Sequence, residues 1–271
     1  DVTDAPIKYN TEGIFGFGLD ASSNNVGMTN LVSSSGVIGT DVTAVGTGRR
    51  VAAATEYGGD KGIFGFGYDG TSLTAITNLV SNAGVVATDV TGVGTAREGQ
   101  GACGYGYDKG IFGFGTTGGA SGYRSMTNLV SNAGVVATDT TGVGTARSNS
   151  AACEYGGDKG IFGYGYNGSG DLSMTNLVSN AGVVATDTTG VGTARTNLAA
   201  CGYDYDKGIF GYGLNGGDQS VTNLVTNAGV VGSDVTGVGT ARAYLAACEY
   251  GEDKGILAYG EDDRGEVSMS N

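Results

Sequence analysis

The hexapeptide Gly160-Ile161-Phe162-Gly163-Tyr164-Gly165 decides how this chain folds, because it alternates aromatic and small residues and recurs along the sequence. Further copies begin at Gly13, Gly62, Gly110 and Gly208, and a variant with Leu-Ala in place of Phe-Gly begins at Gly255. Alternation with a period of two is typical of a β-strand and places both rings on one face. The spacing predicts a protein built from repeats of about 48 residues.

Three other runs accompany each hexapeptide. In the fourth repeat they are Ala151–Tyr155 before it, then Met174–Val178 and Val183–Asp187 after it. Segments rich in Gly, Asp, Asn and Ser separate the runs, as expected for tight turns. We therefore expect four antiparallel strands in each repeat.

The number of runs predicts how the repeats close. The first three runs occur six times, counting Ile7–Tyr9 and Glu266–Asn271, whereas the fourth occurs five times. Asp1–Thr3 matches the end of the fourth run, so we expect this segment to complete the last repeat. Residues 1–271 then form a single domain, a six-bladed β-propeller whose four-stranded blades stack around an axis, the aromatic face of one on the Gly/Ala face of the next. A five-bladed ring with a spare hairpin is the alternative.

The repeat resembles the kelch repeat. Arg195, Ala199-Ala200, Lys207–Gly213 and Val221–Leu224 occupy, in order, the places of the kelch arginine, the small-residue first strand, the Gly-rich second strand and the third strand. The chain also looks like repeat arrays in uncharacterised proteins of tailed phages. The kelch-like resemblance implies a propeller that offers a protein-binding platform rather than a reaction.

Composition excludes several classes of function. The net charge of −13 would repel a nucleic-acid backbone. The sequence contains no run of eighteen apolar residues, so it predicts no insertion in a membrane. Histidine is absent, which rules out Ser-His-Asp and Cys-His catalysis, the His ligands of kelch-type copper oxidases and most catalytic zinc sites. We expect no enzyme, cofactor or metal site. Four acidic residues of the loops could bind calcium, but they lack the spacing of an EF-hand. They are Asp69, Asp171, Asp262 and Asp263.

One arginine precedes the innermost strand in each of five repeats. These residues are Arg49, Arg97, Arg147, Arg195 and Arg242. We expect them around the mouth of the channel, where two interpretations stay open: salt bridges with recurring acids such as Asp139 and Asp187, or a site for an anion.

The loops between the second and third runs differ in every repeat, whereas the opposite side of the repeats is nearly invariant. Either drift or recognition of a partner explains such variation. The candidate binding residues in these loops are Asp69, Tyr123, Arg124, Asn167, Asp171, Asn215 and Asp218.

The four cysteines occupy one position in successive repeats: Cys103, Cys153, Cys201 and Cys248. They lack the paired spacing of a zinc site. We expect buried free thiols, with disulfides between neighbouring blades as the alternative.

These features together predict a non-enzymatic structural or adhesive module, displayed on a virion, filament or cell surface. Its expected partners are protein subunits of the same or a larger assembly. The alternative is a carbohydrate-binding propeller that recognises surface glycans with tyrosine-rich grooves, and a glycosidase comes third. We also expect an exposed edge along Val267–Asn271, completed by a neighbouring subunit or another segment.

Overall fold

The computed structural model describes residues 10–119 and 121–271, and all of their regular secondary structure is β. Four three-stranded antiparallel sheets form the middle of the chain. They are β3 (Ala53–Tyr57), β4 (Lys61–Tyr68) and β5 (Leu73–Val80); β6 (Gly101–Tyr105), β7 (Lys109–Gly113) and β8 (Thr127–Val130); β9 (Ala151–Tyr155), β10 (Lys159–Gly163) and β11 (Thr175–Val178); β12 (Ala199–Tyr203), β13 (Lys207–Gly211) and β14 (Thr222–Val225).

Shorter sheets precede and follow these four. They are β1 (Gly13–Leu19) with β2 (Asn25–Val32), β15 (Ala246–Tyr250) with β16 (Lys254–Ala258), and the small hairpin of β17 (Glu261–Asp262) and β18 (Gly265–Glu266). We number the other sheets one to six in chain order and leave the small hairpin of β17 and β18 out of this numbering. The expected strand at Ile7–Tyr9 and the expected closing segment Asp1–Thr3 lie outside the described residues.

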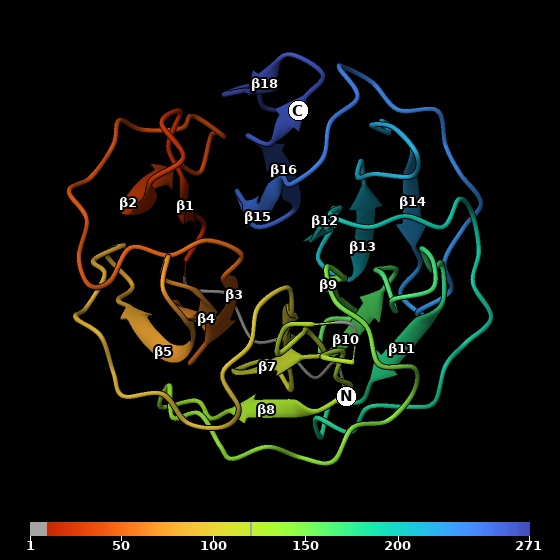
Figure 1. Ribbon diagram of the computed structural model, residues 1–271, viewed down its shortest axis with the longest axis horizontal. Helices are drawn as coiled ribbons and strands as arrows, with labels where there is room; N and C mark the ends of the chain where they lie inside the picture. The colour runs from red at the N-terminus through yellow and green to blue at the C-terminus, as the bar shows by residue number, and fades with distance from the viewer. Residues whose placement is uncertain (1–9, 120) are drawn as a thin grey trace, which may run out of the picture.

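In the four three-stranded sheets, the hexapeptide forms the middle strand. In the fourth sheet Ile161 of β10 lies opposite Cys153 of β9 on one side and Leu177 of β11 on the other. Figure 1 shows the sheets side by side around the centre of the view. Strands β3, β9, β12 and β15 lie toward the centre, and the third strands lie toward the periphery. The order of the first three runs is thus as predicted.

The fourth run does not form a strand, which corrects the expectation of four-stranded sheets. In the third sheet it makes only two isolated bridges, Val136 with Val130 and Thr140 with Thr127. Between them, Nδ2 of Asn128 donates to the carbonyl of Ala137 at 3.0 Å. The N–H of Ala137 donates to the carbonyl of Leu129 at 2.8 Å, so backbone and side-chain hydrogen bonds together hold the outer segment without a continuous ladder.

Neighbouring sheets approach closely because glycine lies opposite large side chains. A Cβ on Gly113 of the third sheet would lie 2.7 Å from Cζ of Phe162 in the fourth sheet. A Cβ on Gly160 would likewise lie 2.5 Å from Sγ of Cys103. The predicted packing of aromatic residues on glycine is therefore confirmed, and it seals each interface with apolar contact.

The second aromatic residue of the hexapeptide departs from strict alternation. Tyr164 has a φ of +63°, in the left-handed region that non-glycine residues seldom adopt. Its ring turns to the fifth sheet and packs edge-on against Phe210, with centroids 5.1 Å apart, whereas Phe162 faces the third sheet. The prediction that both rings share one face was wrong, and the interface between the fourth and fifth sheets receives a ring from either side.

Backbone hydrogen bonds join the turns of consecutive sheets at the nearly invariant end. Each turn donates an N–H to a carbonyl in the turn of the next sheet, and the last such bond runs from Gly251 of the sixth sheet to Thr11 before the first, at 2.7 Å. Strand β15 also contacts β1. The others join Gly58 to Asp108, Gly106 to Asp158, Gly156 to Asp206 and Asp204 to Asp253.

Replacing Gly160 by Ala should lower the free energy of unfolding by about 1–3 kcal/mol, because the added methyl group collides with the sulfur of Cys103. Replacing Cys103 by Ala as well removes that sulfur. The double variant should therefore lose less free energy of unfolding than the sum of the losses of the two single variants, by at least about 0.5 kcal/mol. Urea denaturation measures all three variants.

Gly170→Ala is the matched control for this cycle. No atom lies within 4 Å of its added Cβ, so its free energy of unfolding should stay within about 0.5 kcal/mol of the unchanged chain. Strictly additive costs for Gly160→Ala and Cys103→Ala would contradict the close approach of the third and fourth sheets.

Candidate functional site

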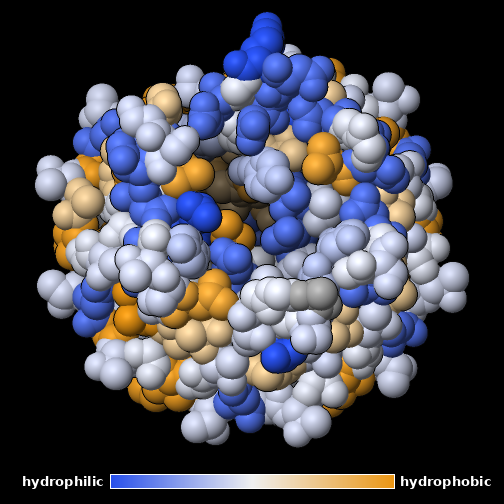
Figure 2. All heavy atoms as spheres, in the orientation of Figure 1, coloured by the Kyte–Doolittle hydropathy of each residue, from blue (hydrophilic) through white to orange (hydrophobic). Residues whose placement is uncertain are grey.

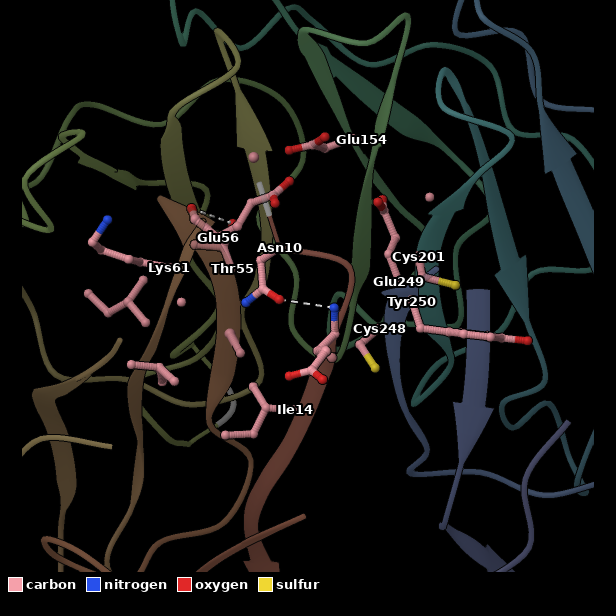
Figure 3. A pocket seen from close by; sticks show the side chains of 18 of the residues that line it. Asn10, Ile14, Thr55, Glu56, Lys61, Glu154, Cys201, Cys248, Glu249 and Tyr250 are labelled. Carbon is pink, nitrogen blue, oxygen red and sulfur yellow. Dashed lines mark hydrogen bonds between the residues drawn. The ribbon is translucent and has the colours of Figure 1, made fainter. Parts of the chain in front are cut away.

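A cavity of about 220 Å³ lies among the innermost strands. Strands β3, β6, β9, β12 and β15 line it, together with residues that precede β1. Figure 2 shows one face of the molecule hollowed near its centre, and Figure 3 shows the lining side chains. The cavity is the feature on which all the sheets converge.

Glutamate and glycine alternate around this cavity at one position of the innermost strands. Glu56, Glu154 and Glu249 come from β3, β9 and β15, and Gly104 and Gly202 come from the strands between them. The glutamate side chains converge on one space (Figure 3). A Cβ on Gly104 would collide with Oε1 of Glu154, and one on Gly202 with Oε1 of Glu249. Each glycine therefore leaves room for the carboxylate of the next sheet, and the lining is acidic.

The four cysteines are free thiols that point into the interfaces between sheets. Cys103, Cys153 and Cys201 are buried, and Cys248 is half-buried. Burial raises the pKa of all four, that of Cys248 to about 12, and the charge of Glu249 acts in the same direction there. Because only a thiolate is a good nucleophile, these thiols serve packing rather than chemistry.

A thiol titration checks this assignment. In urea without reductant, the unfolded chain should show four groups that react with Ellman's reagent, because no disulfide joins the cysteines. In the native protein at pH 8, Cys103, Cys153 and Cys201 should react at least about 100-fold more slowly, since burial keeps them protonated and inaccessible. An unfolded chain with no reactive thiol would contradict the placement of the innermost strands.

The five candidate arginines are buried between sheets, with 0% of each residue exposed. Arg97 lies between the second and third sheets. Its Nε donates to the carbonyl of Phe114 at 2.8 Å and its Nη2 to Oδ1 of Asn128 at 2.7 Å, while its guanidinium lies 4.3 Å from the centre of the Phe66 ring. These side chains therefore do not surround an accessible channel mouth, which corrects that expectation. The salt-bridge interpretation fits them better than the anion site.

An aspartate completes each of four such arrangements. Asp139 of the third sheet accepts hydrogen bonds from the amide and hydroxyl of Thr95 at 3.0 and 2.6 Å and from Nδ2 of Asn128 at 2.9 Å, and it lies 4.0 Å from Nη1 of Arg97. We call this set of Thr, Arg, Asn and Asp a clamp, because it fastens the segment after one sheet to the next sheet. The four clamps are Thr47, Arg49, Asn78 and Asp89; Thr95, Arg97, Asn128 and Asp139; Thr145, Arg147, Asn176 and Asp187; Thr193, Arg195, Asn223 and Asp234.

The clamp shifts the ionisation of both charged partners. Burial lowers the pKa of Arg97 to about 10, although the charge of Asp139 acts against it. Burial alone would raise the pKa of Asp139, but the hydrogen bonds from Thr95 and Asn128 and the charge of Arg97 outweigh it, so the net pKa is lowered. The other three clamp aspartates have lowered pKa values for the same reasons.

Residues two positions after the arginines connect consecutive repeats. They form a chain of four backbone hydrogen bonds just before the innermost strands, in which the N–H of each later residue donates to the carbonyl of its counterpart one repeat earlier, and all five have φ between +52° and +66°. They are Val51, Gly99, Asn149, Asn197 and Tyr244. Gly and Asn favour positive φ, so the residue type indicates this backbone conformation at three of the five positions, although the sequence analysis did not identify them. Val51 and Tyr244 give no such indication.

The variable loops lie beside the arginine segments, as expected. In the fourth repeat Tyr166, at the start of the loop, forms a bridge with Ser148, the residue after Arg147. Three of the candidate loop residues shape their own turns: Asp69 accepts from the amides of Thr71 and Ser72, and Arg124 and Asn167 bond similarly nearby. Nδ2 of Asn215 instead donates to the carbonyl of Ala194, the residue before Arg195, at 2.6 Å.

Two groups of loop residues come together from neighbouring repeats. The rings of Tyr123 and Tyr166 pack edge-on, with centroids 5.8 Å apart. Burial and the charges of Asp263 and Asp262 raise the pKa of Asp218. Burial also raises the pKa of Asp171.

The described residues show neither a cluster of metal ligands nor a membrane-spanning helix. Within residues 10–119 and 121–271, no group of three His, Cys, Asp or Glu side chains could hold a metal ion. In the same part of the chain, no helix is long and apolar enough to cross a bilayer.

Acid should weaken the protein through its clamps. A carboxyl group whose pKa is lowered by folding stabilises the folded state above its unfolded pKa, and that contribution is lost as the pH falls through the folded pKa. The free energy of unfolding should therefore be flat from pH 7 to about 5 and fall below about pH 4. Asp139→Asn should cost about 1–3 kcal/mol at pH 7 and make the decline shallower.

Asp171→Asn is the control with the opposite sign, because the pKa of Asp171 is raised. Its removal should make the acid decline slightly steeper. Urea denaturation at pH 7, 5, 4 and 3 separates the two outcomes. An Asp139→Asn variant with the full acid decline would show that the clamp does not hold an ionised carboxylate.

Comparison of the sequence with models of protein families gives no match, and comparison with curated proteins gives none either. The kelch-like resemblance of the repeat therefore stays a prediction.

Proposed function

We propose that the six sheets are the blades of one closed β-propeller, and that this propeller is a non-enzymatic structural or adhesive module of a larger assembly on a virion, filament or cell surface. The observation that carries the arrangement is the contact between the last and first sheets, where Gly251 donates to Thr11 and β15 touches β1. A row of sheets that ended without this contact would be a solenoid instead.

Repeated exposed groups favour binding over catalysis. One valine of each turn after the third strand is about two-thirds exposed, and these residues recur at the same place in five repeats. They are Val37, Val85, Val135, Val183 and Val230. Weak identical contacts of this kind gain strength when a partner engages several at once. The other end of the sheets carries the loops that differ in each repeat, which suits selective recognition.

The alternative is a carbohydrate-binding propeller. Exposed tyrosines offer flat amphipathic rings, on which a sugar can stack while its hydroxyls bond nearby polar groups. Tyr107, Tyr205 and Tyr244 are 51%, 66% and 57% exposed. Only the first two lie in equivalent turns, so a lectin with a site in every repeat receives less support than a protein-binding module.

Electron microscopy of negatively stained single molecules tests the arrangement. Class averages viewed down the axis should show a ring of six similar densities, because the repeats are nearly equal in length. Five densities with a projecting hairpin, or an open arc, would contradict the closed six-bladed propeller.

A glycan array separates the two functions. The assembly module should bind no glycan better than the variant Tyr244→Ala/Tyr205→Ala, which lacks two exposed rings. Specific binding that this variant loses would establish the lectin instead. A screen of chromogenic glycosides covers the glycosidase, for which turnover would overturn the non-enzymatic assignment.

A further inference from the structure

The polar groups that hold an aspartate in the clamps occur once more, between the fifth and sixth sheets. Thr240 and Arg242 follow the fifth sheet at the spacing found in the four clamps. Asn271 forms two backbone hydrogen bonds of 2.9 Å with Leu257 of β16 and thereby takes the place of the clamp asparagine. In the part of the chain that the structure describes, no aspartate fills the fourth place. This donor half of a clamp consists of Thr240, Arg242 and Asn271.

Arg242 in this donor half is a buried cation, with 0% of the residue exposed. Its Nε, Nη1 and Nη2 donate to the carbonyls of Tyr259, Thr240 and Leu257 at 2.9, 3.3 and 3.4 Å. All three acceptors are neutral, whereas the charge of an aspartate acts on the arginine in every complete clamp. Because a buried cation is stabilised by a nearby anion, this place favours a carboxylate.

The matching acceptor half lies on the first sheet. Asp41 accepts a hydrogen bond of 2.8 Å from Nδ2 of Asn30, as the clamp aspartates do from their asparagines. In complete clamps the aspartate also accepts from the amide and hydroxyl of a threonine, as Asp187 does from Thr145. Among the described residues, no threonine or arginine takes this place beside Asp41. The first sheet thus presents an exposed carboxylate with half of its usual partners.

An unpaired backbone edge lies between these two halves. Ser270 pairs with Ala258 of β16 on one side. In the fourth sheet the equivalent Thr175 pairs with Gly163 on one side and with Thr188 of the outer segment on the other. No described residue pairs with the outer side of Ser270. Asn271 is exposed, whereas the clamp asparagines of the second to fifth sheets are 0% exposed.

One segment can satisfy both halves. In the complete repeats the outer segment carries the aspartate of one clamp and then the threonine and arginine of the next. Asp187, for example, precedes Thr193 by six residues and Arg195 by eight. The same spacing placed along the edge of the sixth sheet would bring a carboxylate to Thr240 and Arg242 and a Thr-x-Arg pair to Asp41.

We propose that the edge at Ser270 and Asn271, with its donor half and with Asp41, is a receptor for an extended segment that carries an aspartate followed by threonine and arginine six and eight residues later. The receptor rests on the proposed propeller, since that arrangement places the sixth sheet beside the first. The segment adds to the sheet edge through backbone hydrogen bonds, and its three polar side chains set the register. The receptor therefore recognises both the charged side chains of the segment and their spacing along it.

The test uses a fluorescent peptide with the sequence of residues 177–195 and fluorescence anisotropy with the full chain. Binding should be saturable, because the peptide supplies both missing halves. Asp187→Asn in the peptide, or Asp41→Asn in the protein, should each weaken binding about 10-fold, since each leaves one charge of a clamp unpaired. These changes avoid Arg242, whose replacement could unfold the protein. Asp204→Asn in the protein, at an exposed turn of the fifth sheet, is the matched control and should leave the affinity unchanged.

Three outcomes would overturn the receptor: no saturable binding at 1 mM peptide as an order-of-magnitude limit for weak complexes, equal binding of a scrambled peptide, or binding that appears only after deletion of residues 1–9. The last would show that the chain covers this edge itself. Electron microscopy of the same sample keeps the two proposals apart. A ring of six densities without peptide binding removes the receptor alone, whereas an open arc removes the propeller.

Discussion

Contact between the faces of neighbouring sheets is the interaction on which the rest of the structure depends. Each sheet has at most three short strands, and both of its faces are apolar, so it cannot bury its surface alone. Glycine on one sheet admits a ring from the next sheet or a sulfur from the preceding one, as Gly113 admits Phe162 and Gly160 admits Cys103. The abundance of glycine therefore serves packing between sheets as well as turns.

The clamps add specific polar contacts between neighbouring sheets to this apolar packing. A guanidinium with no exposed surface would be costly between two sheets, but aromatic rings, backbone carbonyls and an aspartate surround it. The groups of one clamp come from the end of one sheet and the outer part of the next. The same residues thus fix both the distance between sheets and the course of the connecting segment, and the exposed ends remain available for partners.

The sequence predicted the first three strands of each repeat and the packing of rings on glycine, because a period of two and recurring turns are local signals. It did not predict the left-handed backbone at Tyr164, which reverses the direction of that ring, because nothing in the residue type indicates a positive φ. It placed the arginines at an accessible mouth because a charged side chain near a loop is usually exposed. Their burial depends on partners such as Asn128 and Asp139, which meet Arg97 only when two repeats pack together.

The alternation of glutamate and glycine around the cavity has a consequence for how such a chain changes in length. Nearly identical repeats invite unequal recombination, which deletes or duplicates whole repeats. Loss of one repeat would set two glutamate-bearing strands side by side, for example those of Glu56 and Glu154, without the space that Gly104 provides. Loss of two repeats would keep the alternation intact. The alternation seen in the second to sixth sheets is therefore compatible with a change of two repeats but not with a change of one.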